Sequence, residues 1–150
     1  MTRAVRFLER RSVSFEIVRY RHLEKGALFA SEAIGMPLEQ TIKTLVVEIG
    51  KKDYIAVLMP GSKTIALKKF AKSFGGKRAA MVDADTAERI TGYVIGGISP
   101  FAMKHRLPVV IDEGLLEFDR VAINGGKRGV MLIMSPRDIM EVTNAELAEL

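Results

Sequence analysis

Residues 44–59 read TLVVEIGKKDYIAVLM, and the rest of the predicted sheet is built around them. The stretch contains two apolar runs, Thr44–Ile49 and Tyr54–Met59, which lie on either side of Gly50-Lys51-Lys52-Asp53. Apolar runs of this length next to a turn that contains glycine are typical of β-strands. Because a short turn joins antiparallel neighbours, the stretch predicts a hairpin or two neighbouring strands.

Other strands and helices follow on both sides of this pair. Thr2 can cap a first helix that runs to about Arg11. Further helices are expected over Ala27–Ile34, over Thr64–Phe74, from Asp83 to Gly92 and from Pro136 onward. Short strands are expected over Val13–Ile17, Ala79–Val82, Tyr93–Ile95, Val109–Ile111, Val121–Ile123 and Val130–Met134.

The order of these elements indicates the fold class. Helices and strands interleave, yet several strands are joined by short turns, so the sheet should be mixed in an α+β or α/β domain. At 150 residues, 1–150 form one domain. We expect six to seven strands that curl into a barrel or half-barrel with helices around them.

Composition limits the classes of function. The chain has no cysteine, which excludes disulfides, thiolate metal sites and a cysteine nucleophile, and which fits a cytoplasmic protein. No apolar run approaches the roughly 20 residues of a membrane helix, and residues 1–10 lack a signal-peptide core, so we expect a soluble protein without a membrane partner. A net charge of +5 favours polyanionic partners, although it also serves solubility alone.

Several familiar catalytic arrangements are missing. The chain has two isolated histidines and no clustered carboxylates, so a metal site is not expected. The sequence Gly97-Ile98-Ser99-Pro100 lacks the closing glycine of a serine-hydrolase elbow, and neither a phosphate loop nor a dinucleotide motif is present. Any chemistry here therefore proceeds without an obvious side-chain nucleophile.

The segment Gly96-Gly97-Ile98-Ser99-Pro100 is the most informative local motif. Two glycines let a ligand approach the backbone closely, and successive N–H groups can form an anion-binding nest or an oxyanion hole. A glycine bulge followed by a proline turn explains the same residues. Lys43, at the entrance of a strand, either lies at the mouth of a cleft or is a solvated strand end.

Two further features have competing explanations. Asp138 in Ser135-Pro136-Arg137-Asp138 sits where an acid favours the start of a helix, and this position alone explains its residue type. Basic residues form groups that either follow an RNA backbone or are solvated surface. These groups are Lys63, Lys68, Lys69 and Lys72; Lys77-Arg78; Lys104-His105-Arg106; and Lys127-Arg128.

Five segments, taken in order, resemble one family. They are Ile42-Lys43-Thr44-Leu45-Val46-Val47, Thr91-Gly92-Tyr93-Val94-Ile95-Gly96-Gly97-Ile98-Ser99-Pro100, Arg106-Leu107-Pro108-Val109-Val110-Ile111-Asp112, Gly125-Gly126-Lys127-Arg128-Gly129 and Ser135-Pro136-Arg137-Asp138. This string resembles the YbaK/EbsC family, whose members are related to the editing domain of bacterial prolyl-tRNA synthetases. The chain departs from the family at Ala102-Met103, where a Gly-Gln pair is common.

The resemblance implies deacylation of aminoacyl-tRNA in trans, typically of cysteine on proline tRNA. It implies a mixed, barrel-like sheet and no metal or organic cofactor, and some members act in a complex with prolyl-tRNA synthetase and tRNA. The family's functional lysine, tyrosine and aspartate map onto Lys43, Tyr20 and Asp138, and its loop glycines map onto Gly96 and Gly97.

In cysteine-removing members the substrate thiol attacks its own ester, so the protein positions the substrate and stabilises the oxyanion. We expect N–H groups of Gly97 and Ile98 to meet this charge and Lys43 to hold the terminal nucleotide or add positive field. We expect Asp138 to bind the α-ammonium or fix Lys43, and Tyr20 to form a wall of the pocket. Other expected substrate-binding residues are Gly96, Ser99, Pro100, Lys127 and Arg128.

Two alternatives remain open at this point. An Ala-tRNA(Pro) deacylase would need a bound water, because alanine has no thiol. A non-catalytic module that binds tRNA or a synthetase would show salt-sensitive binding without turnover.

Overall fold

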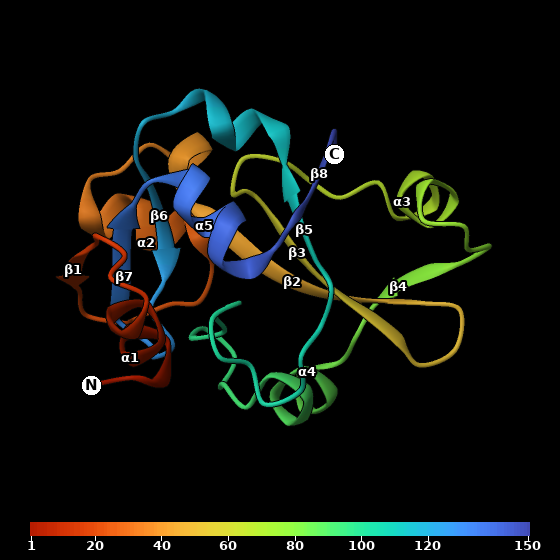
Figure 1. Ribbon diagram of the computed structural model, residues 1–150, viewed down its shortest axis with the longest axis horizontal. Helices are drawn as coiled ribbons and strands as arrows, with labels where there is room; N and C mark the ends of the chain where they lie inside the picture. The colour runs from red at the N-terminus through yellow and green to blue at the C-terminus, as the bar shows by residue number, and fades with distance from the viewer.

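A computed structural model describes residues 1–150 and contains eight strands and five α-helices (Figure 1). The strands are β1 (Glu16–Arg19), β2 (Ile42–Ile49), β3 (Asp53–Pro60), β4 (Ala79–Met81), β5 (Val109–Asp112), β6 (Val121–Asn124), β7 (Val130–Met134) and β8 (Glu146–Ala148). The helices are α1 (Arg3–Arg10), α2 (Ala27–Ile34), α3 (Leu67–Ser73), α4 (Ala84–Thr91) and α5 (Pro136–Thr143), with short 3-10 helices at Leu38–Gln40 and Glu113–Glu117. None of the helices combines the length and apolar composition that crossing a bilayer requires.

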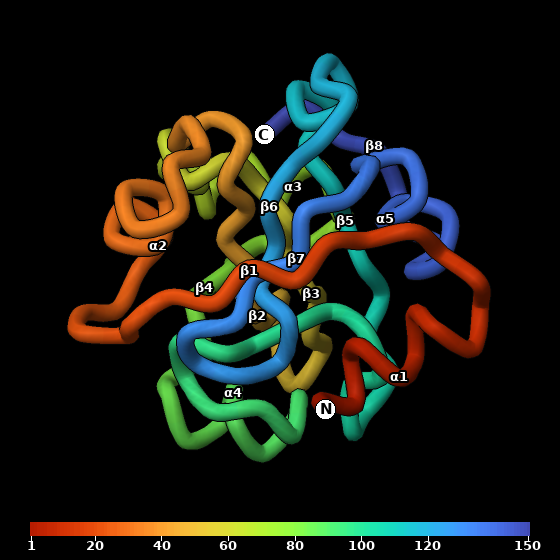
Figure 2. The backbone as a smooth tube through the Cα atoms, turned by 90° about the vertical axis from the view of Figure 1, so that its left-hand side faces the viewer, coloured from red at the N-terminus to blue at the C-terminus, as the bar shows by residue number.

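The strands form two sheets. The larger has the order β4-β2-β3-β5-β8 and includes the predicted antiparallel hairpin, in which Lys43 lies opposite Met59. Strand β5 runs parallel to β3 and to β8, and the smaller sheet β1-β7-β6 is antiparallel. Figure 2 shows β1, β7 and β6 side by side. A bridge between Thr41 and Ala122 joins the two sheets, which do not close into a barrel. The predicted mixed α+β fold is confirmed.

The alternation of side chains along β3 divides the core into layers. Ala56 and Leu58 face the main cluster, which also takes side chains from α1, β6, β7 and α5. Val57 and Met59 point to the opposite face of the sheet and pack against α3. Because successive residues of a strand face opposite sides, one hairpin strand can support both layers.

The predicted helix starts and ends are confirmed where a cap is present. The Thr2 hydroxyl accepts the N–H of Val5 at 3.1 Å, and the Asp83 carboxylate accepts the N–H of Thr86 at 2.7 Å. Helices α2 and α4 end at Gly35 and Gly92, whose φ angles of 73° and 77° place them in the left-handed region that glycine adopts without strain.

Some predicted boundaries are wrong. Tyr93–Ile95 is an irregular turn and not a strand, because its groups bond to α4 and within the loop instead of to a neighbouring strand. The Tyr93 hydroxyl donates to the carbonyl of Phe101, and the Ile95 N–H donates to the Glu88 carboxylate at 2.7 Å. Strand β1 begins at Glu16 and not at Val13, because its hydrogen-bonded pairing with β7 begins there. Helix α3 is shorter than the predicted Thr64–Phe74, and β8 was not predicted.

Candidate functional site

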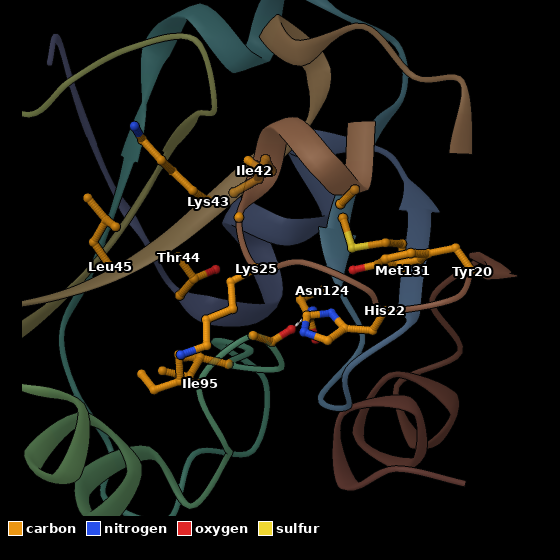
Figure 3. A pocket seen from close by; sticks show the side chains of 15 residues that line it. Tyr20, His22, Lys25, Ile42, Lys43, Thr44, Leu45, Ile95, Asn124 and Met131 are labelled. Carbon is orange, nitrogen blue, oxygen red and sulfur yellow. Dashed lines mark hydrogen bonds between the residues drawn. The ribbon is translucent and has the colours of Figure 1, made fainter. Parts of the chain in front are cut away.

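A cavity of about 340 Å³ opens where the start of β2 meets α2 and the smaller sheet (Figure 3). This volume lies within the range of small-ligand sites. Two of its lining residues are lysines and none is acidic, so the cavity favours a negatively charged or electron-rich ligand. The lining residues are Tyr20, His22, Lys25, Gly26, Ala27, Ala30, Ile42, Lys43, Thr44, Leu45, Ile95, Gly96, Ile98, Asn124 and Met131.

Lys43 provides a half-buried cation at one wall of this cavity. Its ammonium donates to the backbone carbonyl of Lys63, and in Figure 3 its side chain extends away from Tyr20 and Met131. Burial lowers the pKa of Lys43, because desolvation disfavours the charged form. A lysine stem has several rotatable bonds, so this ammonium can turn from the carbonyl to a bound ligand.

Part of the glycine loop forms a wall of the same cavity. The Gly97 N–H donates to the carbonyl of Val94 at 2.8 Å and is therefore engaged within the turn. Gly96 and Ile98 line the cavity, and their N–H groups have no backbone acceptor. These two groups are the donors in the loop that can meet an oxyanion.

The turn after β6 holds the glycine loop in place. The Asn124 side-chain amide donates to the carbonyl of Gly96 at 2.8 Å, and the Arg128 guanidinium donates to the carbonyl of Ile95 at 2.7 Å. A Cβ at Gly97 would lie 3.0 Å from backbone atoms of Lys127 and Arg128, so the two segments touch through their main chains. Lys127 and Arg128 are exposed beside the loop, where they can meet a phosphate.

Tyr20 forms another wall of the cavity. Its backbone N–H donates to the carbonyl of Gly129 at 2.9 Å, and its ring centre lies 6.2 Å from that of Phe29. Burial raises the pKa of the Tyr20 phenol, an effect that a hydrogen bond with the Gly129 backbone partly offsets. The phenol therefore stays neutral at physiological pH.

Two polar groups of the cavity are not among the residues predicted from the sequence. His22 Nδ1 and Thr44 Oγ1 are buried and have no hydrogen-bond partner. Buried polar atoms are normally paired, so unpaired ones that line a cavity are candidates for ligand contact. Thr44 follows Lys43 directly, and His22 lies two residues after Tyr20. This closeness to predicted site residues was the signal available in the sequence.

The structure separates other predicted site residues from this cavity. Ser99 is fully buried, and its hydroxyl accepts the N–H of Phe101 at 3.1 Å. Pro100 lines a different hollow, together with Ala102 and Met103, so the residues that depart from the family pattern lie outside the lining of the cavity. Asp138 lies in a third hollow and is not brought together with Lys43.

Similarity to a known family adds to this geometry. The model of the aminoacyl-tRNA editing domain matches residues 25–142. The chain belongs to this family. The chain is 30% identical to a protein of Enterococcus faecalis named Cys-tRNA(Pro)/Cys-tRNA(Cys) deacylase EbsC, over 99% of the chain and 92% of that relative.

Two more relatives support the assignment to this editing domain. The chain is 28% identical to the multifunctional Ser/Thr-tRNA deacylase ProXp-y of Escherichia coli, over 97% of the chain and 89% of that protein. A crystal structure described as a trans-editing enzyme for prolyl tRNA synthetase superposes with a TM-score of 0.88 at 28% identity, covering 99% of this chain and 94% of that one. The family resemblance is thereby confirmed, together with its fold and its class of activity, aminoacyl-tRNA deacylation.

Proposed function

We propose that this editing domain removes cysteine from Cys-tRNA(Pro) in trans. The observation that carries the proposal is a cavity that joins Lys43 to the unpaired N–H groups of Gly96 and Ile98 and contains no side-chain nucleophile. Such a site suits a substrate that supplies its own attacking group. The full-length similarity to EbsC supports cysteine as the amino acid removed.

In the proposed reaction the substrate thiolate forms an S–C bond to the ester carbonyl. The carbonyl oxygen becomes an oxyanion, which accepts hydrogen bonds from Gly96 and Ile98. Collapse of this intermediate breaks the C–O bond, so that tRNA leaves with a 3′-hydroxyl and the acyl group leaves as a cyclic thioester. The proton released by the thiol ends on the 3′-oxygen. The positive charge of Lys43 stabilises the oxyanion, or its ammonium binds the terminal nucleotide.

The rest of the cavity would orient the aminoacyl group. Tyr20 and Met131 provide an uncharged wall for a small side chain. The substrate amine can donate to His22 Nδ1 and Thr44 Oγ1, both of which lack a partner within the chain. We assign these contacts to the amine in place of Asp138, which lies in a separate hollow.

A deacylation panel tests the proposal. Cysteinyl-, alanyl- and serinyl-tRNA(Pro) are incubated side by side with wild type, Lys43→Ala and the exposed control Lys51→Ala. We expect cysteine to be removed fastest and Lys43→Ala to lower the rate on the order of 10²–10³, as loss of one stabilising group does in other oxyanion sites. A wild-type rate for Lys43→Ala would show that its assignment is wrong.

A second candidate is a water-using deacylase for an amino acid without a thiol. The similarity to ProXp-y, which is named for serine and threonine, favours this alternative. In the same panel it predicts faster release of serine or alanine than of cysteine. Turnover of none of the three, with tRNA still bound, would instead indicate a non-catalytic module.

We also propose that the protein works in the cytoplasm with prolyl-tRNA synthetase. The structural similarity to a trans-editing enzyme for that synthetase supports this partner. Co-sedimentation of the two proteins with and without tRNA measures the association, and the absence of a joint peak in both conditions would exclude a stable complex.

A further inference from the structure

We propose that an exposed cationic surface on α3 and on the segment that leads into β4 binds the phosphate backbone of the same tRNA, away from the aminoacyl end. We call it the α3 surface, and it consists of Lys68, Lys69, Lys72, Lys77 and Arg78. This inference rests on the proposed function, because it assigns a second contact to the substrate of that site. In this arrangement the α3 surface binds the RNA backbone, while the reaction at the aminoacyl end takes place in the cavity.

The charge of this region is one-sided. Six cations and no acid lie between Asp53 and Asp83, and the five residues of the α3 surface are all exposed. The two ion pairs of the protein are Lys63–Asp112 and Arg120–Glu16, so none of the five is neutralised by a carboxylate. Glu149 lines a hollow beside Lys69 without forming an ion pair.

The packing of α3 explains why its lysines point to solvent. Phe70 and Ala71 are buried, and Leu67 and Phe74 pack on the same cluster behind β2 and β3. Positions three and four residues apart share one face of a helix, so burial of this apolar face sends the three lysines to the other side. Figure 1 shows α3 and β4 at the end of the larger sheet remote from α2, which borders the cavity.

The same helix is electrostatically unfavourable for the protein alone. Lys68 and Lys72 are like charges four residues apart, and such pairs destabilise a helix. Lys68 and Lys69 also lie in the first turn of α3, where the helix dipole disfavours cations and where no acid is present. Both helices have a favourable cation in the last turn, Lys72 in α3 and Arg89 in α4, but only α4 has an acid, Asp85, in its first turn. A polyanion bound to α3 would relieve the repulsion.

The α3 surface is connected to the cavity through the chain. The Lys43 ammonium donates to the carbonyl of Lys63, and the segment after Lys63 leads directly into α3. Along β2, Lys43 is six residues from Ile49, which lies beside Ala79 of β4. At about 3.3 Å per residue this separation is about 20 Å. A tRNA whose end occupies the cavity would therefore meet the α3 surface with phosphates further along its acceptor arm.

Two substrates of different length separate this contact from the chemistry. Full Cys-tRNA(Pro) and a cysteinylated trinucleotide with the CCA sequence are compared for wild type and for Lys68→Gln/Lys69→Gln/Lys72→Gln. The matched control, Arg6→Gln/Arg10→Gln/Arg19→Gln, removes three exposed positive charges from α1 and β1, elsewhere on the molecule. Glutamine is a good helix former, so α3 should be retained, and circular dichroism checks this.

We expect the α3 variant to raise KM for the full tRNA about tenfold and to leave kcat and the trinucleotide reaction unchanged. Each lost phosphate contact should also reduce the slope of log affinity against log salt by about 0.7–0.9. The control should keep the wild-type KM and slope. Phosphate contacts of this kind hold the RNA without reading its sequence, so the effect should not depend on the acceptor-stem sequence.

Other outcomes overturn the inference. An unchanged KM and salt slope in the α3 variant would show that the α3 surface does not contact tRNA. An equal rise in KM in the control variant would show that only the net charge of the protein matters. A defect only when prolyl-tRNA synthetase is present would assign the surface to a protein partner. If wild type turns over neither substrate, the proposed function fails, while salt-titrated binding of uncharged tRNA still decides whether α3 contacts RNA.

Discussion

Replacement of Gly97 by alanine tests whether the glycine loop must touch the turn after β6. The new Cβ would lie 3.0 Å from the Lys127 carbonyl carbon, the Lys127 Cα and the Arg128 nitrogen, whereas ordinary contacts begin at 3.4 Å. The loop or the turn must therefore move by about 0.4 Å, and backbone atoms cannot rotate out of the way as a side chain can. Asn124 and Arg128 tie both segments together, so the strain reaches the donors of the cavity.

The size of the effect follows from this displacement. Overpacking of this kind costs about 1–3 kcal/mol, and for a chain of this length each kcal/mol lowers Tm by about 2–4 °C. A misplacement of 1 Å at a reacting group can cost about 10² in rate, so a shift of about 0.4 Å should lower kcat about tenfold. Thermal unfolding and single-turnover deacylation of Cys-tRNA(Pro) measure the two effects on one protein preparation.

Gly50→Ala provides the matched control. Gly50 has a φ of +64°, and a methyl group at this position would have no atom within 4 Å, so alanine there is strained but meets nothing. We expect it to lower stability by about 1 kcal/mol and to leave kcat unchanged. A wild-type Tm and kcat for Gly97→Ala, or an equal loss of kcat in both variants, would refute the need for close contact at Gly97.

Three further predictions concern stability. Thr2→Ala should cost about 1 kcal/mol in urea unfolding, because the Thr2 hydroxyl caps α1 and also donates to the Gly125 carbonyl at 2.6 Å, whereas Thr2→Ser should be near wild type. Ala102→Gly should raise stability by up to about 1 kcal/mol, because Ala102 has a φ of +55°, and unchanged deacylation would confirm that it lies outside the site. Since burial lowers the pKa of Lys43, the unfolded chain binds its proton more tightly, and wild type should gain stability relative to Lys43→Met as pH rises through the lowered pKa toward 10.5. A constant difference between pH 8 and pH 10 would contradict the last prediction.

Local sequence patterns predicted the elements that rely on neighbouring residues. The hairpin over 44–59 and the bounds of α2 followed from apolar runs and glycine positions, and both are present. Tyr93–Ile95 has the same apolar composition but is a turn, since its polar groups find partners in α4 and within the loop and its Tyr93 ring belongs to the core. Strand β8 was missed because its residues are mostly exposed and its only partner, β5, lies more than thirty residues earlier.

The candidate site divides in the same way. Lys43, Tyr20 and the Gly96-Gly97 loop could be identified from the sequence, because their residue types and order match one family. The folded chain was needed to show which loop N–H groups are unpaired, that Asp138 lies in another hollow, and that His22 and Thr44 face the cavity without partners. Hydrogen-bond partners and cavity walls come from segments far apart in the chain, and their meeting depends on how the two sheets pack, which no local pattern encodes.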